Sequence, residues 1–122
     1  FILLALSACS TSSTGRKQVS LYSNAELTQL GITSFEQMKK EIPISKHKVT
    51  TDFVRCVANA ITKNVSKSAH QGEWEVFVFD SEKINAFALP GGKIGVYTGI
   101  LNVTENQEQL AAIIGHEIGH VI

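Results

Sequence analysis

Apolar residues recur with helical spacing in the N-terminal half of the chain. Residues 23–26 (SNAE) have the S-x-x-E form of a capping box, which predicts a helix beginning there. Pro43 should end this helix, and Gly31 predicts an interruption within it. The apolar positions that carry its pattern are Leu27, Leu30, Phe35 and Met38.

A second stretch has a more regular helical period. Phe53, Val57, Ile61 and Val65 follow one another at intervals of four residues, and Val54 and Ala58 widen the stripe. We expect this segment to be a helix whose apolar face packs on a core.

The period becomes extended after Gln71-Gly72. Residues 73–80 (EWEVFVFD) are rich in aromatic and β-branched side chains, which predicts a strand buried on at least one face. In residues 84–101, Pro90-Gly91-Gly92 separates two extended runs and predicts a β-hairpin. Because proline and glycine weaken strand pairing, we expect the hairpin at the edge of the sheet.

Residues 104–122 carry a third helical pattern. Residues 104–107 (TENQ) have the T-x-x-Q form of a capping box, and no breaker other than glycine follows. At about 100° per residue, the apolar side chains of this helix gather within about 80° and should face the core. They are Leu110, Ile114, Ile118 and Val121.

His116 and His120 point away from that apolar face. They differ by about 40° in direction and by one turn in height, so both rings can reach one ion from the same side. Glu117 lies about 100° from His116 and flanks the pair. The alternative is an exposed histidine pair on a solvated helix face.

This spacing is the H-E-x-x-H pattern of zinc peptidases, in residues 116–120 (HEIGH). Zinc takes neutral imidazole nitrogens, and a catalytic site leaves one position to water, whose pKa the ion lowers to ~7. Glu117 is placed to act as general base. Gly115 and Gly119 cost about 1 kcal/mol each in a helix, and we expect them to admit another backbone beside the site. His47 and His70 have no such partners and should play no part.

Composition narrows the function and adds one signal at the N-terminus. Eleven basic and eleven acidic residues in 122 give a formal charge of zero, which argues against a nucleic-acid partner.

Residues 1–8 are typical of a signal-peptide remnant, and residues 6–9 (LSAC) resemble a bacterial lipobox. That resemblance implies a lipid anchor on Cys9 and a tether over residues 9–22; Ser10 favours an outer-membrane address. The alternative is an ordinary secretory cleavage site followed by a chance cysteine. If Cys9 is acylated, Cys56 has no disulfide partner, and we expect it to be a small buried residue.

Residues 116–120 and residues 85–92 (NAFALPGG) together resemble the zinc metallopeptidase family of CAAX prenyl endopeptidases, HtpX, BepA and LoiP, and most closely its LoiP-like periplasmic lipoprotein branch. The resemblance implies an α+β, zincin-like domain. Residues 23–122 would be its N-terminal part, truncated after the active-site helix, and the chain would be a fragment at both ends.

The resemblance also implies residue roles. His116 and His120 would hold one Zn²⁺ ion and Glu117 would be the base. Asn85 to Tyr97 would be the edge strand on which an extended substrate lies, with Asn85, Ala86, Phe87 and Ala88 as substrate-binding residues. The family's third zinc ligand is a glutamate on a later helix, so we expect the chain as printed to bind zinc weakly and to be inactive alone.

The function that follows is cleavage of unfolded or damaged cell-envelope proteins on the periplasmic side of the outer membrane. One rival is a non-catalytic envelope lipoprotein that keeps the zinc site and acts as a chaperone or assembly factor. A second rival is a structural zinc module, which would want four protein ligands and has only Cys56 to spare.

Overall fold

The structure is a computed structural model that describes residues 9–11, 17–19 and 22–122. The predicted signal-peptide remnant, residues 1–8, lies outside the described residues, as does part of the predicted tether. Within that tether, two short strands pair antiparallel. The elements, in chain order, are β1 (Cys9–Thr11), β2 (Lys17–Val19), α2 (Asn24–Glu41), α3 (Lys48–Thr62), β3 (Glu75–Phe79), β4 (Ala86–Leu89), β5 (Lys93–Tyr97), α4 (Thr98–Leu101) and α5 (Gln107–Gly119).

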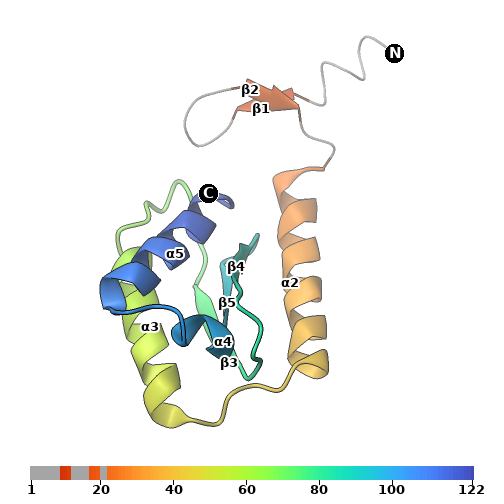
Figure 1. Ribbon diagram of the computed structural model, residues 1–122. Coiled ribbons are helices and arrows are strands. Elements are labelled where there is room, and N and C mark those ends of the chain that lie inside the picture. The colour runs from red at the N-terminus through yellow and green to blue at the C-terminus, as the bar shows by residue number, and fades with distance from the viewer. Residues whose placement is uncertain (1–8, 12–16, 20–21) are drawn as a thin grey trace.

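The larger sheet has three strands and lies between two layers of helices (Figure 1). Its strand order is β3-β5-β4, with β3 parallel and β4 antiparallel to β5. α3 and α5 cover one face, where the main core cluster joins their apolar side chains to those of the sheet. α2 covers the other face through a cluster of aromatic rings. The predicted α+β class is confirmed at this level of mixed helices on a small sheet.

α2 runs through Gly31 without a break, so the predicted interruption is wrong. Ser23 caps the helix as predicted, its hydroxyl accepting a hydrogen bond from the Glu26 amide at 3.1 Å. The glycine has a different role. A Cβ at Gly31 would lie 1.9 Å from the Pro90 carbonyl oxygen, so only glycine lets the turn between β4 and β5 dock on α2.

α3 buries the stripe that its sequence predicts, but shifted round the helix. Val54, Val57 and Ala58 are buried, whereas Phe53, predicted on the same face, is 43% exposed. The core therefore lies under the middle of the widened stripe. The helix begins after His47, whose ring nitrogen Nδ1 accepts a hydrogen bond from the Thr50 amide.

The predicted strand and hairpin are both present. β3 lies within residues 73–80, and β4 pairs antiparallel with β5 across a turn in which Gly91 and Gly92 have φ of 95° and 75°. Of the two strands of the hairpin, β4 lies at an edge of the sheet and β5 does not, because β5 also pairs with β3 and is the central strand. Residues 98–101, predicted as extended, form the short helix α4.

α5 begins two residues later than the capping pattern predicts. Asn106, and not Thr104, is the N-cap, and its side chain accepts a hydrogen bond from the Gln109 amide at 2.9 Å. Leu110, Ile114 and Ile118 are buried, as predicted. In the part of the chain that the structure describes, no helix combines the length and apolar character needed to cross a membrane.

Candidate metal centre beside an open sheet edge

The histidine pair lies at the C-terminal end of α5, on the side turned away from the core. His116 is in the last turn, and His120 is the C-cap, with its amide donating to the Glu117 carbonyl. Both histidines are exposed, while Ile114 and Ile118 of the same helix are 1% and 2% exposed. Burial of the apolar face therefore fixes the helix about its axis and directs both imidazoles outward.

The two imidazole rings converge. Their Nε2 atoms lie 3.0 Å apart, the ring centroids are 4.6 Å apart and the ring planes meet at 88°. Two nitrogens at this distance share either a proton or a cation, because two bare lone pairs would repel. With bonds of ~2.0 to 2.1 Å, a tetrahedral zinc ion holds two nitrogens about 3.3 Å apart. A shift of a few tenths of an ångström would suit that geometry, so the pair fits zinc.

Glu117 stands next to the pair on the same turn and is half-buried. Its carbonyl accepts the His120 amide at the end of the helix, and the position of its carboxylate beside the histidines stays a prediction from helix geometry. Among residues 22–122, His, Cys, Asp and Glu side chains nowhere gather in threes that could hold a metal ion. The described part of the chain thus supplies two candidate ligands and a neighbouring carboxylate.

The glycines beside the site meet no neighbour. A Cβ at Gly115 or Gly119 would find nothing within 4 Å, so the expected close approach of another backbone does not occur among the described residues. The surface of α5 beside the histidines is open space.

The candidate substrate strand, β4, has an open outer edge. The Tyr97 amide donates to the Asn85 carbonyl at 3.0 Å, and hydrogen-bonded pairs alternate along an antiparallel ladder. Phe87 and Leu89 are therefore the residues that bond to β5, and Ala86 and Ala88 direct their N–H and C=O groups outward. In the described residues, β4 has no second neighbouring strand.

The side chains of β4 alternate between the two helical layers. Ala86 and Ala88 pack against the cluster that contains Ile114 and Ile118 of α5. Phe87 faces the other way, with its ring centroid 6.3 Å from that of Phe35 on α2. Of the predicted substrate-binding residues, Ala86 and Ala88 offer main-chain groups, whereas Phe87 is a packing residue. The predicted strand Asn85 to Tyr97 is too long, since its second half is the central strand.

The opposite edge of the sheet, β3, is covered. The segment before α3 crosses it: the Ser45 amide donates to the Val78 carbonyl at 2.8 Å, and the Asp80 amide donates to the Pro43 carbonyl at 2.7 Å. Further along, the Arg55 Nε donates to the Val76 carbonyl at 3.2 Å. No local pattern in the sequence indicates this role of Arg55. Only the fold shows which strand needs a cover.

An ion-paired network holds the covered side of the sheet to α2. Glu75 on β3 accepts from Lys93 at 2.7 Å and from Lys39 on α2 at 3.0 Å. The bond from Lys93, followed by that from Lys39, holds the pKa of the Glu75 carboxyl below its ordinary value. Lys39 also lies 4.6 Å from the ring centroid of Phe77. This network holds α2 against the sheet and includes neither histidine of the pair.

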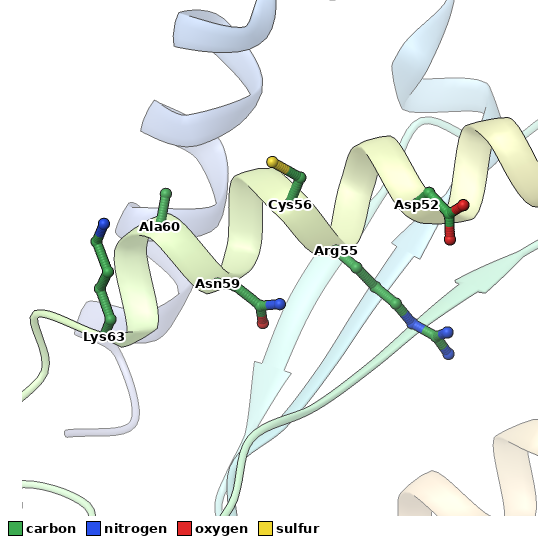
Figure 2. Close-up of a pocket in the computed structure, with 6 residues that line it drawn as sticks. All are labelled: Asp52, Arg55, Cys56, Asn59, Ala60 and Lys63. Carbon is green, nitrogen blue, oxygen red and sulfur yellow. The ribbon is translucent and has the colours of Figure 1, made fainter.

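Figure 2 shows a shallow hollow along the outer face of α3, from which Cys56 projects. The expectation of a buried Cys56 is wrong: its thiol is free and exposed. The periodic stripe that buries Val57 and Ala58 turns the residue before them outward. The hollow lies on a different helix from the histidine pair. His47 and His70 have structural contacts, as a helix cap and as a ring 4.4 Å from Trp74.

The chain is similar to a family of known peptidases and to several named proteins. Residues 48–122, more than half of the chain, match peptidase family M48. The chain is 36% identical over 116 residues to the protein of Danio rerio named "Metalloendopeptidase OMA1, mitochondrial", which covers 89% of this chain and 24% of that protein. It is 26% identical over 85 residues to the "Beta-barrel assembly-enhancing protease" of Yersinia pestis, covering 70% of this chain and 17% of that protein.

A third relative matches over a shorter stretch. The mitochondrial metalloendopeptidase OMA1 of Arabidopsis thaliana is 49% identical over 49 residues, which is 40% of this chain and 10% of that protein. The chain thus spans no more than a quarter of the length of these relatives. The match of more than half of the chain to one family, together with these relatives, shows that the chain belongs to the metallopeptidases of family M48.

Proposed function

We propose that the protein is a zinc-dependent endopeptidase that cleaves extended segments of unfolded or damaged polypeptides. The observation that carries the proposal is the convergence of the His116 and His120 Nε2 atoms, 3.0 Å apart, with Glu117 beside them. Membership of family M48 and the names of the relatives support a metalloendopeptidase.

Each residue has a distinct part in the proposed reaction. His116 and His120 would hold zinc through Nε2, each as a neutral ring. When bound, the ion supplies Lewis acidity and a water of lowered pKa. Glu117 accepts a proton from the attacking water and delivers it to the amine that leaves. Among the described residues, no third His, Cys, Asp or Glu side chain gathers with this pair.

The open edge of β4 supports the choice of substrate. A polypeptide added to this edge is bound through the outward N–H and C=O groups of Ala86 and Ala88, which read no side chain. Only a segment free of its own secondary structure can pair in this way, so unfolded chains are the substrates that the edge suits.

The proposal extends to location. The lipobox-like residues 6–9 favour a lipid anchor on Cys9 and the periplasmic side of a bacterial outer membrane, as in a LoiP-like lipoprotein. The matched relatives carry both mitochondrial and bacterial names. Substrates in the cell envelope and attachment through Cys9 are both parts of this proposal. The attachment is tested by mass spectrometry of the N-terminal peptide, which should carry acyl chains.

The experiment on activity uses the full-length protein and a quenched fluorescent casein. We expect one zinc per chain by elemental analysis, loss of cleavage on treatment with 1,10-phenanthroline and recovery on adding zinc. Glu117→Gln should lower cleavage about 10²- to 10⁴-fold while the zinc content stays at one. Glu108→Gln, in the exposed first turn of α5, is the matched control and should leave cleavage unchanged.

Two results would contradict the proposed endopeptidase activity. Cleavage that survives both the chelator and Glu117→Gln would exclude the proposed chemistry. Retained zinc with no cleavage of any unfolded substrate would instead favour the non-catalytic chaperone or assembly role.

A further inference from the structure

α2 packs on the face of the sheet that includes β4, the strand with the open edge. α2 is fixed over the sheet at two points: Gly31 touches the Pro90 carbonyl after β4, and the Phe35 ring packs 6.3 Å from that of Phe87. Lys39, about 80° to one side of Gly31 on the helix, reaches Glu75 and Phe77 on β3. That side of α2 therefore faces the covered edge, and the opposite side faces the open one.

The opposite side of α2 carries two leucines. Leu27 and Leu30 lie about 40° and 100° from Gly31, in the direction away from Lys39. Leu27 is half-buried, and Leu30 is 51% exposed although its neighbours on the exposed surface of the helix are polar. Because Gly31 meets the Pro90 carbonyl, Leu27 and Leu30 stand near the end of β4 that leads into Pro90, on the side of α2 away from Lys39 and β3.

A strand added to β4 alternates in the same way as β4 itself. Residues directly opposite one another on neighbouring strands point to the same face of a sheet. Substrate residues that pair with Ala86 and Ala88 therefore face the layer of α3 and α5, and those that pair with Phe87 and Leu89 face α2. The residue opposite Leu89 is the one that comes level with Leu27 and Leu30.

We propose that Leu27 and Leu30 form an apolar wall that contacts the substrate side chain opposite Leu89 and selects an apolar residue at that position. The inference rests on the proposed function, because the occupant is the same extended polypeptide that β4 binds. It adds specificity: main-chain pairing accepts any sequence, and a wall on one face gives preference at a single position.

The test is a positional scan of fluorogenic peptides with the full-length protein, each cleavage site being mapped by mass spectrometry. We expect one position at which leucine is preferred to lysine, and its two neighbours, which face α5, should not share that preference. In Leu30→Glu, kcat/KM for the leucine peptide should fall about five- to tenfold and that for the lysine peptide should rise. Leu30→Met should keep the original order.

Controls separate specificity from folding and from chemistry. A peptide with glycine at the selected position should be cleaved equally by Leu30→Glu and the unsubstituted protein, which shows an intact fold. Val49→Glu makes the same change at a residue of α3 that is 74% exposed and should alter nothing. If the protein cleaves the peptides in a zinc-dependent manner but Leu30→Glu keeps the same order of preference, this inference is overturned and the proposed function stands. If nothing is cleaved, both fall.

Discussion

The two edges of the sheet meet different surroundings. Along β3, the outward carbonyls of Val76 and Val78 accept bonds from Arg55 and Ser45. Along β4, the outward groups of Ala86 and Ala88 have no neighbouring strand among the described residues, and the strand packs on the helix that carries the histidines. A free edge is a hazard that proteins normally cover. The fold covers the β3 edge and leaves open the β4 edge, which belongs to the strand that packs on α5. This difference suggests that the β4 edge is left open to bind an extended polypeptide.

The largest effect is expected where β4 is held in place. Gly31→Ala would put a Cβ 1.9 Å from the Pro90 carbonyl oxygen and push the end of β4 off α2. We expect the free energy of unfolding to fall by about 1–3 kcal/mol, measured by urea denaturation of the full-length protein. Gly115→Ala is the control. Nothing lies within 4 Å of its added carbon, so its higher helix propensity should stabilise the protein by up to about 1 kcal/mol. Equal effects of the two substitutions would refute the docking role of Gly31.

A second substitution removes one hydrogen-bond donor from the open edge of β4 without disturbing its pairing with β5. Ala88→Pro removes an N–H that points away from β5, so the ladder with β5 keeps its bonds. We expect kcat/KM for an extended peptide to fall about five- to tenfold, which is the contribution of one main-chain hydrogen bond. Ala88→Ser keeps the N–H and should cleave normally. Unimpaired cleavage by Ala88→Pro would show that substrates bind elsewhere.

A third substitution opens the covered edge. Arg55→Ala leaves the Val76 carbonyl without its 3.2 Å partner and removes the guanidinium that lies 5.9 Å from the Phe77 ring centroid. The expected loss of stability is about 1 kcal/mol, with zinc-dependent cleavage unchanged. Lys48→Ala, which breaks an exposed pair with Asp52, should cost less. A drop in kcat/KM for Arg55→Ala would mean that the β3 edge also takes part in catalysis.

The smallest effect concerns pH at the covered side. Because the pKa of Glu75 is lowered in the folded protein by Lys93 and Lys39, its ionised form stabilises the fold above its ordinary value of 4.5. That contribution is lost as the pH falls through the lowered pKa. Stability should therefore decrease below about pH 4.5, and Glu75→Gln should flatten this decrease. The side chain is 32% exposed, so solvent screens the pairs and the change is modest. A Glu75→Gln profile parallel to the original would exclude this network as the cause.

Local patterns in the sequence predicted the elements well, and long-range contacts decided what the patterns missed. Residues 116–120 lie at the end of a helix with their apolar neighbours buried, because a helical period depends only on residues a few positions apart. Their roles as ligands and base remain predictions. By contrast, β5 became the central strand through its pairing with β3, whose partner residues lie 18 positions away, as in Glu75 and Lys93.

The same distinction explains the individual errors. Gly31 looked like a helix breaker because its reason, the Pro90 carbonyl, lies far along the chain. Asn106 took the capping position from Thr104 because the residues between α4 and α5 bend back on Leu101, to whose carbonyl the Thr104 hydroxyl donates. Residue type favours the interior for Cys56, whereas its angular position on α3 places it at the surface.

The length of β4 has a consequence for the behaviour of the protein in concentrated solution. An unpaired strand is a template for any extended backbone, and the strand of a second copy is as good a match as a substrate. β4 has only four residues. A short edge strand is one of the features that disfavour edge-to-edge pairing between copies of a protein. A strand of this length can bind an unfolded polypeptide transiently and still offers too few main-chain groups to favour aggregation.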